Sequence, residues 1–426
     1  MSNEKFTVAI LGVGARGGNV YGTIINGRAD DFTVTAICDV SEERLSLYGD
    51  KFSVKEENRF LSEDEFFAKR RADSLIIATP DRHHARQAEI ALRLGYTVLL
   101  EKPVAASKNE LLALEKAQNE TGGRLLICHV LRYSPIFIKM LELARSGEIG
   151  KLVTIAAEEP VSFWHHTHSF VRGKARGGKV SASMLLAKCC HDLDLICALA
   201  GGRPLTVSSM GSLSYFKAEN APLGAASRCA DCKHASSCAY SAQKIYVDGW
   251  KNAGKPENSW PTNSLATSPI TEEKLLCAIR EGDFGRCVFY CDNDTVDNQF
   301  LIAEFENGVR ATLSMTAFNP AGGRRYVIGG TNGQIELLGD ILKVTKFGEE
   351  PITYSASELK ESTLGKGAAH RDNHGGGDDG LINSLYATLS GSTAEPTLLE
   401  YSLDGYKLGL AAEESRLSGG KLVNIE

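Results

Sequence analysis

Residues 6–17 read FTVAILGVGARG, and this stretch decides the fold of the amino-terminal part of the chain. Phe6 to Leu11 is a short apolar run typical of a buried strand, and it leads directly into the G-x-G-x-x-G loop of residues 12–17. A helix is predicted from Asn19 to Ile25, so the glycines lie between a strand and a helix. Glycines in that place let the backbone approach a pyrophosphate, which the free N–H groups of the helix amino terminus then bind.

The second predicted strand supports a dinucleotide site. Residues 33–38 (TVTAIC) end at Asp39, 22 positions after Gly17, which is the context of a dinucleotide-binding fingerprint. Asp39 is expected to accept hydrogen bonds from the adenosine ribose and to repel a 2′-phosphate, so we predict NAD rather than NADP. Arg44, one turn into the next helix, favours the opposite cofactor preference. The predicted cofactor residues here are Gly12, Gly14, Ala15, Arg16, Gly17 and Asp39.

Strands and helices alternate through the rest of the first third. Further strands are predicted at Ser74–Ala78, Val98–Leu100 and Leu125–Cys128. Two of the intervening helices begin with capping boxes, at Ser62 and at Ser107. Alternation at this spacing predicts an α/β fold whose doubly wound parallel sheet, a Rossmann domain, spans residues 1–128.

Polar residues follow two of these strands, at the sheet edge where such folds bind ligands. Glu101-Lys102-Pro103 comes directly after the apolar run 97–100, and a half-buried lysine there can act as an acid or a base. Thr79 and Pro80 are expected to shape the wall beside the nicotinamide ribose, with His84 capping or orienting that turn. We therefore predict that Lys102 is catalytic. We also predict that five of these residues contact the cofactor: Thr79, Pro80, His84, Glu101 and Lys102.

The composition is that of an ordinary globular enzyme. The chain has 426 residues, of which 43% are hydrophobic and 23% are charged, and this length favours two domains. Its net charge is −6 with no long basic run, which argues against nucleic acid as a partner. No apolar stretch reaches transmembrane length and the first residues lack a signal-peptide core, so we predict no membrane association and a cytoplasmic location.

The chain resembles the Gfo/Idh/MocA oxidoreductases in its motifs and in their order. His191 in the segment CHDLD resembles the catalytic histidine of that family, with Asp194 three residues on. The other matching segments are, in order, the G-x-G-x-x-G loop, Asp39, Thr79-Pro80-x-x-x-His84, Glu101-Lys102-Pro103, residues 129–135 (HVLRYSP), and a closing helix around residues 408–417.

The resemblance implies a Rossmann domain followed by an α/β domain with an open, mostly antiparallel sheet, here residues 129–426. It also implies a bound nicotinamide, commonly a sugar or polyol substrate, and a homo-oligomer, a dimer or tetramer formed through the open sheet. One departure concerns the proton route. The family often has an aspartate four residues before the histidine, where this chain has Ala187.

Sequence patterns in the second half favour an antiparallel sheet. Residues 152–157 are strand-like, and hairpin signals centre on Asn307-Gly308 and Asn332-Gly333. An antiparallel sheet can leave one face exposed, which suits dimer formation.

Residues 183–199 (SMLLAKCCHDLDLICAL) are predicted to form one helix that is apolar nearly all round. Lys188, His191 and Asp192 share a face of it, and titratable groups there are costly unless they line a site. The alternative is a satisfied buried network. We predict that Lys188 and His191 are catalytic with Lys102, and that Lys188 and Asp192 also bind substrate.

Two further segments carry candidate substrate residues. Residues 164–173 (WHHTHSFVRG) mix aromatic, histidine and arginine side chains, and from them we predict His165, His168 and Arg172. A metal site on these histidines and an ordinary loop are the alternatives. His374 opens the run HGGGDD, which is either a surface loop or a loop that closes over substrate.

A cysteine cluster marks an insertion at about residues 203–292. Cys229, Cys232 and Cys238 offer three corners of a tetrahedral zinc site, and we take Cys291 as the fourth, with Cys287 and His234 as alternatives. Ordinary reduced cysteines are the competing interpretation. No catalytic metal is expected.

Three functions are compatible with these residues. The first is an NAD-dependent dehydrogenase acting on a hydroxyl or keto group of a sugar, sugar derivative or glycoside. The second is an NAD-dependent glycoside hydrolase, which oxidises a sugar hydroxyl transiently, eliminates the aglycone and adds water. The third, a nucleotide-binding sensor, is disfavoured because Lys102 and His191 are both present.

Overall fold

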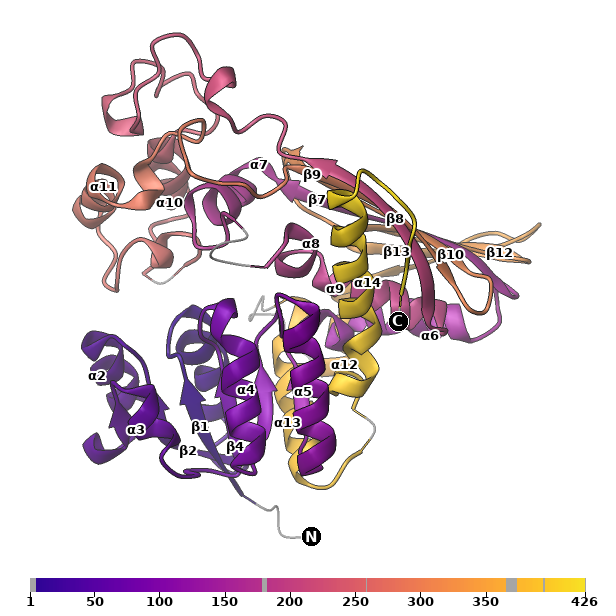
Figure 1. The fold of residues 1–426 in the computed structure, drawn as a ribbon, viewed down its shortest axis with the longest axis horizontal. Coiled ribbons are helices and arrows are strands. Elements are labelled where there is room, and N and C mark those ends of the chain that lie inside the picture. The colour runs from indigo at the N-terminus through magenta and orange to yellow at the C-terminus, as the bar shows by residue number, and fades with distance from the viewer. Residues whose placement is uncertain (1–4, 178–181, 258, 365–373, 394, 426) are drawn as a thin grey trace.

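Two sheets organise the chain in the computed structural model, which describes residues 5–177, 182–257, 259–364, 374–393 and 395–425 (Figure 1). The first sheet is parallel throughout and has six strands in the order β3-β2-β1-β4-β5-β6. Their bounds are β1 Phe6–Leu11, β2 Phe32–Cys38, β3 Arg59–Phe60, β4 Ser74–Ile77, β5 Thr97–Leu100 and β6 Leu125–Ile127. This order confirms the predicted Rossmann sheet.

Helices connect these strands on both faces of the sheet. They are η1 Ala15–Gly22 continuing into α1 Thr23–Asn26, α2 Glu42–Lys51, α3 Glu63–Phe67, α4 His84–Arg93 and α5 Lys108–Thr121. The Ser62 and Ser107 hydroxyls accept from the backbone N–H groups three residues on, as the capping boxes predict. The first helix begins at Ala15 rather than Asn19, so its opening turn is part of the glycine motif itself.

The second sheet has nine strands in the order β14-β13-β12-β11-β7-β10-β9-β8-β15. Neighbours are antiparallel except β7 and β10, which run parallel. The strands are β7 Leu152–Ser162, β8 Pro204–Ser212, β9 Asn298–Phe305, β10 Arg310–Asn319, β11 Arg325–Gly330, β12 Gly333–Leu338, β13 Ile341–Lys346, β14 Ile352–Ser355 and β15 Val423–Asn424. Both predicted hairpins are present, as β9–β10 and β11–β12.

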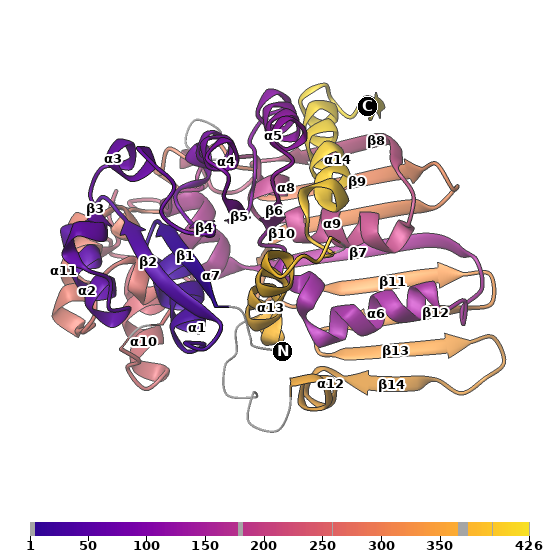
Figure 2. The same ribbon diagram turned by 90° about the horizontal axis from the view of Figure 1, so that it is seen from below.

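Among the described residues, three helices cover one face of this sheet (Figure 2). They are α6 Pro135–Arg145, α9 Cys190–Ala200 and α14 Leu399–Leu417. On the opposite face large apolar side chains are exposed, among them Met210, Phe300 and Ile302, while Leu301 between the last two is buried. The sheet therefore has the open face that the antiparallel pattern predicts.

The insertion lies between β8 and β9, beside α7 Phe163–His166 (Figure 1). It begins after β8 rather than at about residue 203, because residues 204–212 belong to the sheet. Its helices are η6 Ala218–Asn220, η7 Cys229–Asp231, η8 Gln243–Asp248, α10 Gly249–Asn252, η9 Thr262–Ser264, α11 Glu272–Glu281 and η10 Asp283–Gly285. Tyr246, Trp250 and Leu275 anchor a small hydrophobic core of its own.

The predicted helix over residues 183–199 is wrong in one respect, because it is two helices. α8 Met184–Ala187 ends before Lys188, and α9 begins at Cys190. Lys188 consequently lies at the break between the two helices, whereas His191 lies in the first turn of α9. The remaining helices are η4 Val130–Tyr133, η5 Thr167–Arg172, α12 Ala356–Leu364, η12 His374–Gly376 and α13 Gly377–Leu389; η2 Glu56–Asn58 and η3 Asp81–His83 are single turns of the first domain.

Helix α13, near the carboxyl end of the chain, packs back onto the Rossmann domain. Leu381, Ile382 and Leu385 belong to the same buried cluster as Ile10 of β1. The region from residue 377 is therefore a helix that joins the two halves, and not the loop expected of HGGGDD. Within the described residues, no helix has the length and apolarity needed to cross a membrane. The cytoplasmic location stays a prediction.

Candidate active site

A cleft of 1230 Å³ lies at the carboxyl edge of the parallel sheet, between that sheet and α8–α9. Eleven of the predicted site residues contribute to its walls, from both halves of the chain: Ala15, Arg16, Thr79, Pro80, His84, Glu101, Lys102, His165, Lys188, His191 and His374. Predicted site residues as far apart in the sequence as Ala15 and His374, a separation of 359 positions, thus line one cavity.

The glycine loop has the shape that a pyrophosphate needs. Gly12 has φ +90°, and a Cβ there would meet the Ala78 carbonyl oxygen at 2.6 Å. A Cβ on Gly17 would meet the Gly12 carbonyl oxygen at 2.0 Å, so these two glycines allow the tight turn and the close packing. A Cβ on Gly14 would meet only the Arg44 side chain, at 3.9 Å, so its open side is free for a phosphate. The loop therefore fits a dinucleotide.

Asp39 is fixed at the end of β2 behind this loop. Its Oδ2 accepts from the Val13 N–H at 2.9 Å and its Oδ1 accepts from the Ser41 N–H at 3.0 Å. The Arg44 guanidinium lies 3.7 Å from Oδ1. The carboxylate and the guanidinium, which predict opposite cofactor preferences, thus stand next to each other.

Arg16 is the centre of a charged network at the cleft wall. Its Nε lies 2.7 Å from Oε1 of Glu101 and its Nη2 lies 2.6 Å from Oδ1 of Asp378, while the guanidinium also bonds the Tyr21 hydroxyl. The His374 Nδ1–H donates to Asp378 Oδ2, 2.9 Å away. Burial favours the neutral form of Asp378, but His374 and Arg16 outweigh it and lower its pKa to about 2. The network ties η1, β5 and α13 together.

Lys102 reaches from β5 to the second half of the chain. Its Nζ donates to the Ala187 carbonyl oxygen at 2.9 Å, at the break between α8 and α9. The turn that carries it is held by His84, whose ring nitrogens lie 2.7 Å from the Pro103 oxygen and 2.8 Å from the Thr79 oxygen. The residue that replaces the family's aspartate therefore contacts the candidate lysine through its backbone.

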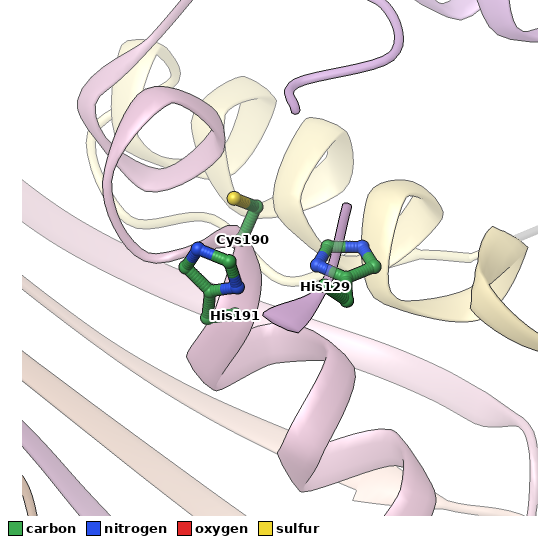
Figure 3. A group of neighbouring side chains, drawn as sticks. All are labelled: His129, Cys190 and His191. Atoms are coloured by element: carbon green, nitrogen blue, oxygen red, sulfur yellow. The ribbon is translucent and has the colours of Figure 1, made fainter. Parts of the chain in front are cut away.

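His191 lies in the first turn of α9, with His129 packed edge-on to it at a ring-centroid distance of 5.5 Å (Figure 3). Burial lowers the pKa of His191 well below 6.5, and the charge of Lys102 lowers it further. The imidazole is neutral at pH 7 and can accept a proton. Its Nδ1 and both nitrogens of His129 are buried without a hydrogen-bond partner in the described structure.

Cys190 completes a cluster with these two histidines. One potential ligand atom of each residue lies within 4.8 Å of the others, so the described residues bring three potential metal ligands together here. Burial raises the pKa of the Cys190 thiol to about 11. Two imidazoles and a thiol are ligands that zinc accepts, but a metal here would take the nitrogens that make His191 a base.

A network of buried charged residues adjoins the cleft. The Lys188 Nζ lies 3.2 Å from Oε1 of Glu159, whose Oε2 lies 2.7 Å from the Arg324 guanidinium. Arg324 also pairs with Asp192, at 2.8 Å from Nε to Oδ1, and the Tyr326 hydroxyl donates to the same oxygen at 2.8 Å. Burial and the neighbouring Glu159 raise the pKa of Asp192, whereas Arg324 and Lys188 overcome burial and lower the pKa of Glu159.

Three predicted substrate residues do not line the cleft, which corrects the expectation from sequence. Asp192 is fully buried in the group just described. His168 stacks on Phe284 at 4.7 Å and bonds the Tyr246 hydroxyl through Nδ1. Arg172 donates to the carbonyl oxygens of Arg286 and Tyr240, each at 2.7 Å. All three side chains bond to or pack against other protein groups. His168 and Arg172 contact the insertion, and Asp192 anchors α9.

The cysteine cluster differs from the predicted zinc set in its fourth member. Cys229, Cys232 and Cys238 line one small cavity together with Cys287, and Cys291 is not among its walls. All of these cysteines are free thiols, and their sulfur atoms do not form a group within 4.8 Å. A zinc ion would require the thiols to draw closer.

Residues that the sequence analysis missed are Arg324, Glu159, Asp378 and His129. Glu159 carried a signal, because it occupies an inward position in the alternation of β7, between Ala157 and Val161. A charged residue at such a position needs a buried partner. Arg324 lies in the turn before β11, where no local pattern marks it.

Buried histidines predict loss of stability in acid. Burial lowers the pKa of His166 from 6.5 to about 4 and that of His168 to about 3. The unfolded chain takes up protons from pH 6.5 downward whereas the folded chain does not, so the stability present above pH 6.5 falls as the pH drops towards 4. Each group costs about 1.4 kcal/mol per pH unit in this window. Urea unfolding between pH 7 and 4.5 measures the slope, and His166→Leu is expected to reduce it; an unchanged slope would contradict this assignment.

Comparison with known proteins decides the family. Residues 6–129 match the Gfo/Idh/MocA description "Oxidoreductase family, NAD-binding Rossmann fold", and residues 142–366 match its "C-terminal alpha/beta domain". The chain belongs to the Gfo/Idh/MocA oxidoreductase family. The predicted family and the NAD-binding domain are thereby confirmed.

Individual relatives of this Gfo/Idh/MocA protein carry several names. YteT of Bacillus subtilis, named as an oxidoreductase, is 23% identical over 364 residues, 83% of this chain and 82% of YteT. An inositol 2-dehydrogenase of Rhizobium meliloti is 26% identical over 49% of this chain and 59% of that enzyme. A glycosyl hydrolase family 109 protein of Streptomyces coelicolor is 31% identical over 34% of this chain and 32% of its own.

A solved structure shares the whole fold. The WlbA dehydrogenase of Chromobacterium violaceum, in complex with NADH and UDP-GlcNAcA, superimposes with a TM-score of 0.67 over 100% of this chain and 97% of WlbA, at 14% identity. The matches to the named inositol dehydrogenase and hydrolase span 59% and 32% of those proteins, so substrate assignment remains a proposal.

Proposed function

We propose that this Gfo/Idh/MocA protein is an NAD-dependent dehydrogenase that oxidises a hydroxyl group, or reduces the matching ketone, of a sugar, polyol or glycoside. The observation that carries the proposal is the pair His191 and Lys102, which approach one cleft from the two halves of the chain. The names of the relatives, an inositol dehydrogenase among them, point to the same substrate class.

His191 is the base in this proposal. Its imidazole is neutral because burial lowers its pKa, so it can take the proton of the substrate hydroxyl. Lys102 uses one N–H on the Ala187 oxygen and has others to donate to the substrate oxygen. The nicotinamide, when bound, supplies the hydride acceptor. Glu159 pairs with Lys188, which lines the same cleft as His191.

The experiment that tests the proposal is a panel of sugars, sugar acids and aryl glycosides with NAD, in which both NADH and released aglycone are measured. A dehydrogenase accumulates NADH. The alternative, an NAD-dependent glycoside hydrolase, is favoured by the resemblance to the family 109 protein and by His165, which lines the cleft and whose pKa burial lowers well below 6.5. A hydrolase releases aglycone with no net NADH.

We further propose that Asp39 makes NAD the preferred cofactor. A carboxylate that hydrogen-bonds the ribose is worth roughly 1.5–3 kcal/mol, so Asp39→Ala is expected to raise KM for NAD by about tenfold or more while KM for NADP falls. Arg44→Ala is the matched variant, since it removes the neighbouring cation and is expected to weaken NADP use further. Steady-state KM values for both cofactors measure this, and a wild-type preference for NADP would refute it.

Two predictions about assembly and metal remain proposals. The exposed apolar face around Phe300 and Ile302 supports a homo-oligomer formed through the nine-stranded sheet, and the solution mass of the protein tests it. The cavity shared by Cys229, Cys232, Cys238 and Cys287 is the place for a structural zinc ion, and metal analysis of the purified protein tests that.

A further inference from the structure

The three tryptophans of the chain gather around one cavity that the proposed reaction does not use. Trp164, Trp250 and Trp260 come from α7, from α10 and from the segment after it, and all line a space of 540 Å³. This volume is in the range of small-molecule sites. The insertion and α7 thus form a pocket distinct from the candidate catalytic cleft.

The pocket adjoins the cleft. Ser259 and Trp260 line both cavities. The Trp260 ring lies 4.9 Å from Trp164 on the pocket side and 4.7 Å from His165, which lines the cleft. Trp260 remains 41% exposed, although a side chain of this size is normally covered. A ligand that extends from the cleft past Trp260 would enter the pocket and cover this ring.

The walls of the pocket are aromatic and aliphatic. Apart from the tryptophans they include Phe163, Ile245 and Ala253. Of its polar members, the Thr262 hydroxyl already donates to the Ser259 carbonyl oxygen at 2.8 Å, and Lys244 is exposed. A second sugar ring would bring several hydroxyls that find few partners here, whereas a flat apolar ring stacks on indole faces.

We propose that this pocket binds the aromatic aglycone of a glycoside whose sugar ring lies in the catalytic cleft. The link to a glycoside rests on the proposed function. The affinity of the pocket for an aromatic ring does not, because it depends only on the walls described above. The enzyme would then select substrates by what is attached to the sugar as well as by the sugar.

Tryptophan fluorescence tests the pocket directly, because every tryptophan of the chain lines it. The sugar-independent probe is phenol, titrated into the full-length protein with excitation selective for tryptophan. Saturable quenching or a shift of the emission is expected. Unchanged emission would overturn the proposal.

Two variants fill the pocket from its rim without touching the core. Ala253→Phe and Ala239→Phe add a ring at exposed wall positions, and Ala218→Phe is the matched control at an exposed alanine of the same insertion that does not line the pocket. Both filled variants are expected to weaken phenol binding by about tenfold or more, equivalent to ~1.4 kcal/mol, and the control to leave it unchanged. Equal phenol binding in all three would overturn the proposal.

Turnover of phenyl and methyl glycosides separates this proposal from the proposed function. Wild-type protein is expected to have a lower KM for the phenyl glycoside, and Ala253→Phe to abolish that preference while kcat on the methyl glycoside persists. If no sugar, polyol or glycoside is turned over but phenol binding is blocked by Ala253→Phe, the proposed function fails and the aromatic pocket stands. If phenyl and methyl glycosides have equal KM in the wild type, the aglycone assignment fails.

Discussion

Replacing His191 by alanine is expected to lower kcat by about 10² to 10⁴-fold while NAD still binds. The size of the effect is that of removing a positioned general base. His191 is buried and neutral at the cleft wall, so the variant loses the proton acceptor without leaving a charge unpaired. Lys102→Ala is expected to have an effect of similar size, because the substrate oxygen loses its donor. Steady-state kinetics with NAD binding by calorimetry measures both.

Matched controls separate catalysis from folding. His83→Ala removes a histidine at the helix start that does not line the cleft, and Lys116→Ala removes an exposed lysine of α5. Both are expected to keep normal kcat. A His191→Ala enzyme with normal turnover would show that the base is another residue. Normal turnover in Lys102→Ala as well would show that the reaction takes place at a different site.

Replacing Arg324 by methionine is expected to destabilise the protein by about 3–5 kcal/mol, the range for breaking a buried ion pair by removing one partner. Arg324 is the cation between two carboxylates, Asp192 and Glu159, which are 0% and 3% exposed. Without it one cation, Lys188, faces two buried acids. Urea unfolding monitored by circular dichroism measures the loss.

The neighbouring Arg325 provides the control for this prediction. It pairs with Glu158 at 3.5 Å on the protein surface, with both side chains at least half exposed, and such pairs are worth about 0–1 kcal/mol. Arg325→Met should therefore unfold close to wild type. Adding Asp192→Asn to Arg324→Met should recover part of the loss, since it removes one unpaired charge. Equal unfolding midpoints for Arg324→Met and Arg325→Met would contradict the buried-pair account.

Local sequence patterns predicted the architecture because most of its elements are marked by a motif of a few residues. The apolar run before G-x-G-x-x-G, the capping serines and the Asn-Gly turns each depend on backbone geometry that a short segment determines. The residues that follow parallel strands meet at one edge of the sheet, so the sequence could predict that Thr79 and Lys102 lie near each other, and both line the cleft.

Elements that depend on distant partners were not predictable in this way. Residues 183–199 have the sequence pattern of one helix, yet the helix is interrupted at Lys188. The Nζ of this lysine pairs with Glu159 on β7. His168 and Arg172 resembled substrate residues by composition, but the insertion folds around them. Arg324 and Asp378 are 132 and 186 positions beyond Asp192, and only the three-dimensional fold brings them to the cleft.

The central claim is that His191 and Lys102 carry out hydride-transfer chemistry with net redox. The most direct measurement is the panel of sugars, sugar acids and aryl glycosides with NAD, assayed in the same reactions for NADH and for free aglycone. We expect at least one carbohydrate to yield NADH in amounts equal to its oxidised product, with this yield lost in His191→Ala. Aglycone release without NADH, in wild type but not in His191→Ala, would contradict the dehydrogenase and establish the hydrolase instead.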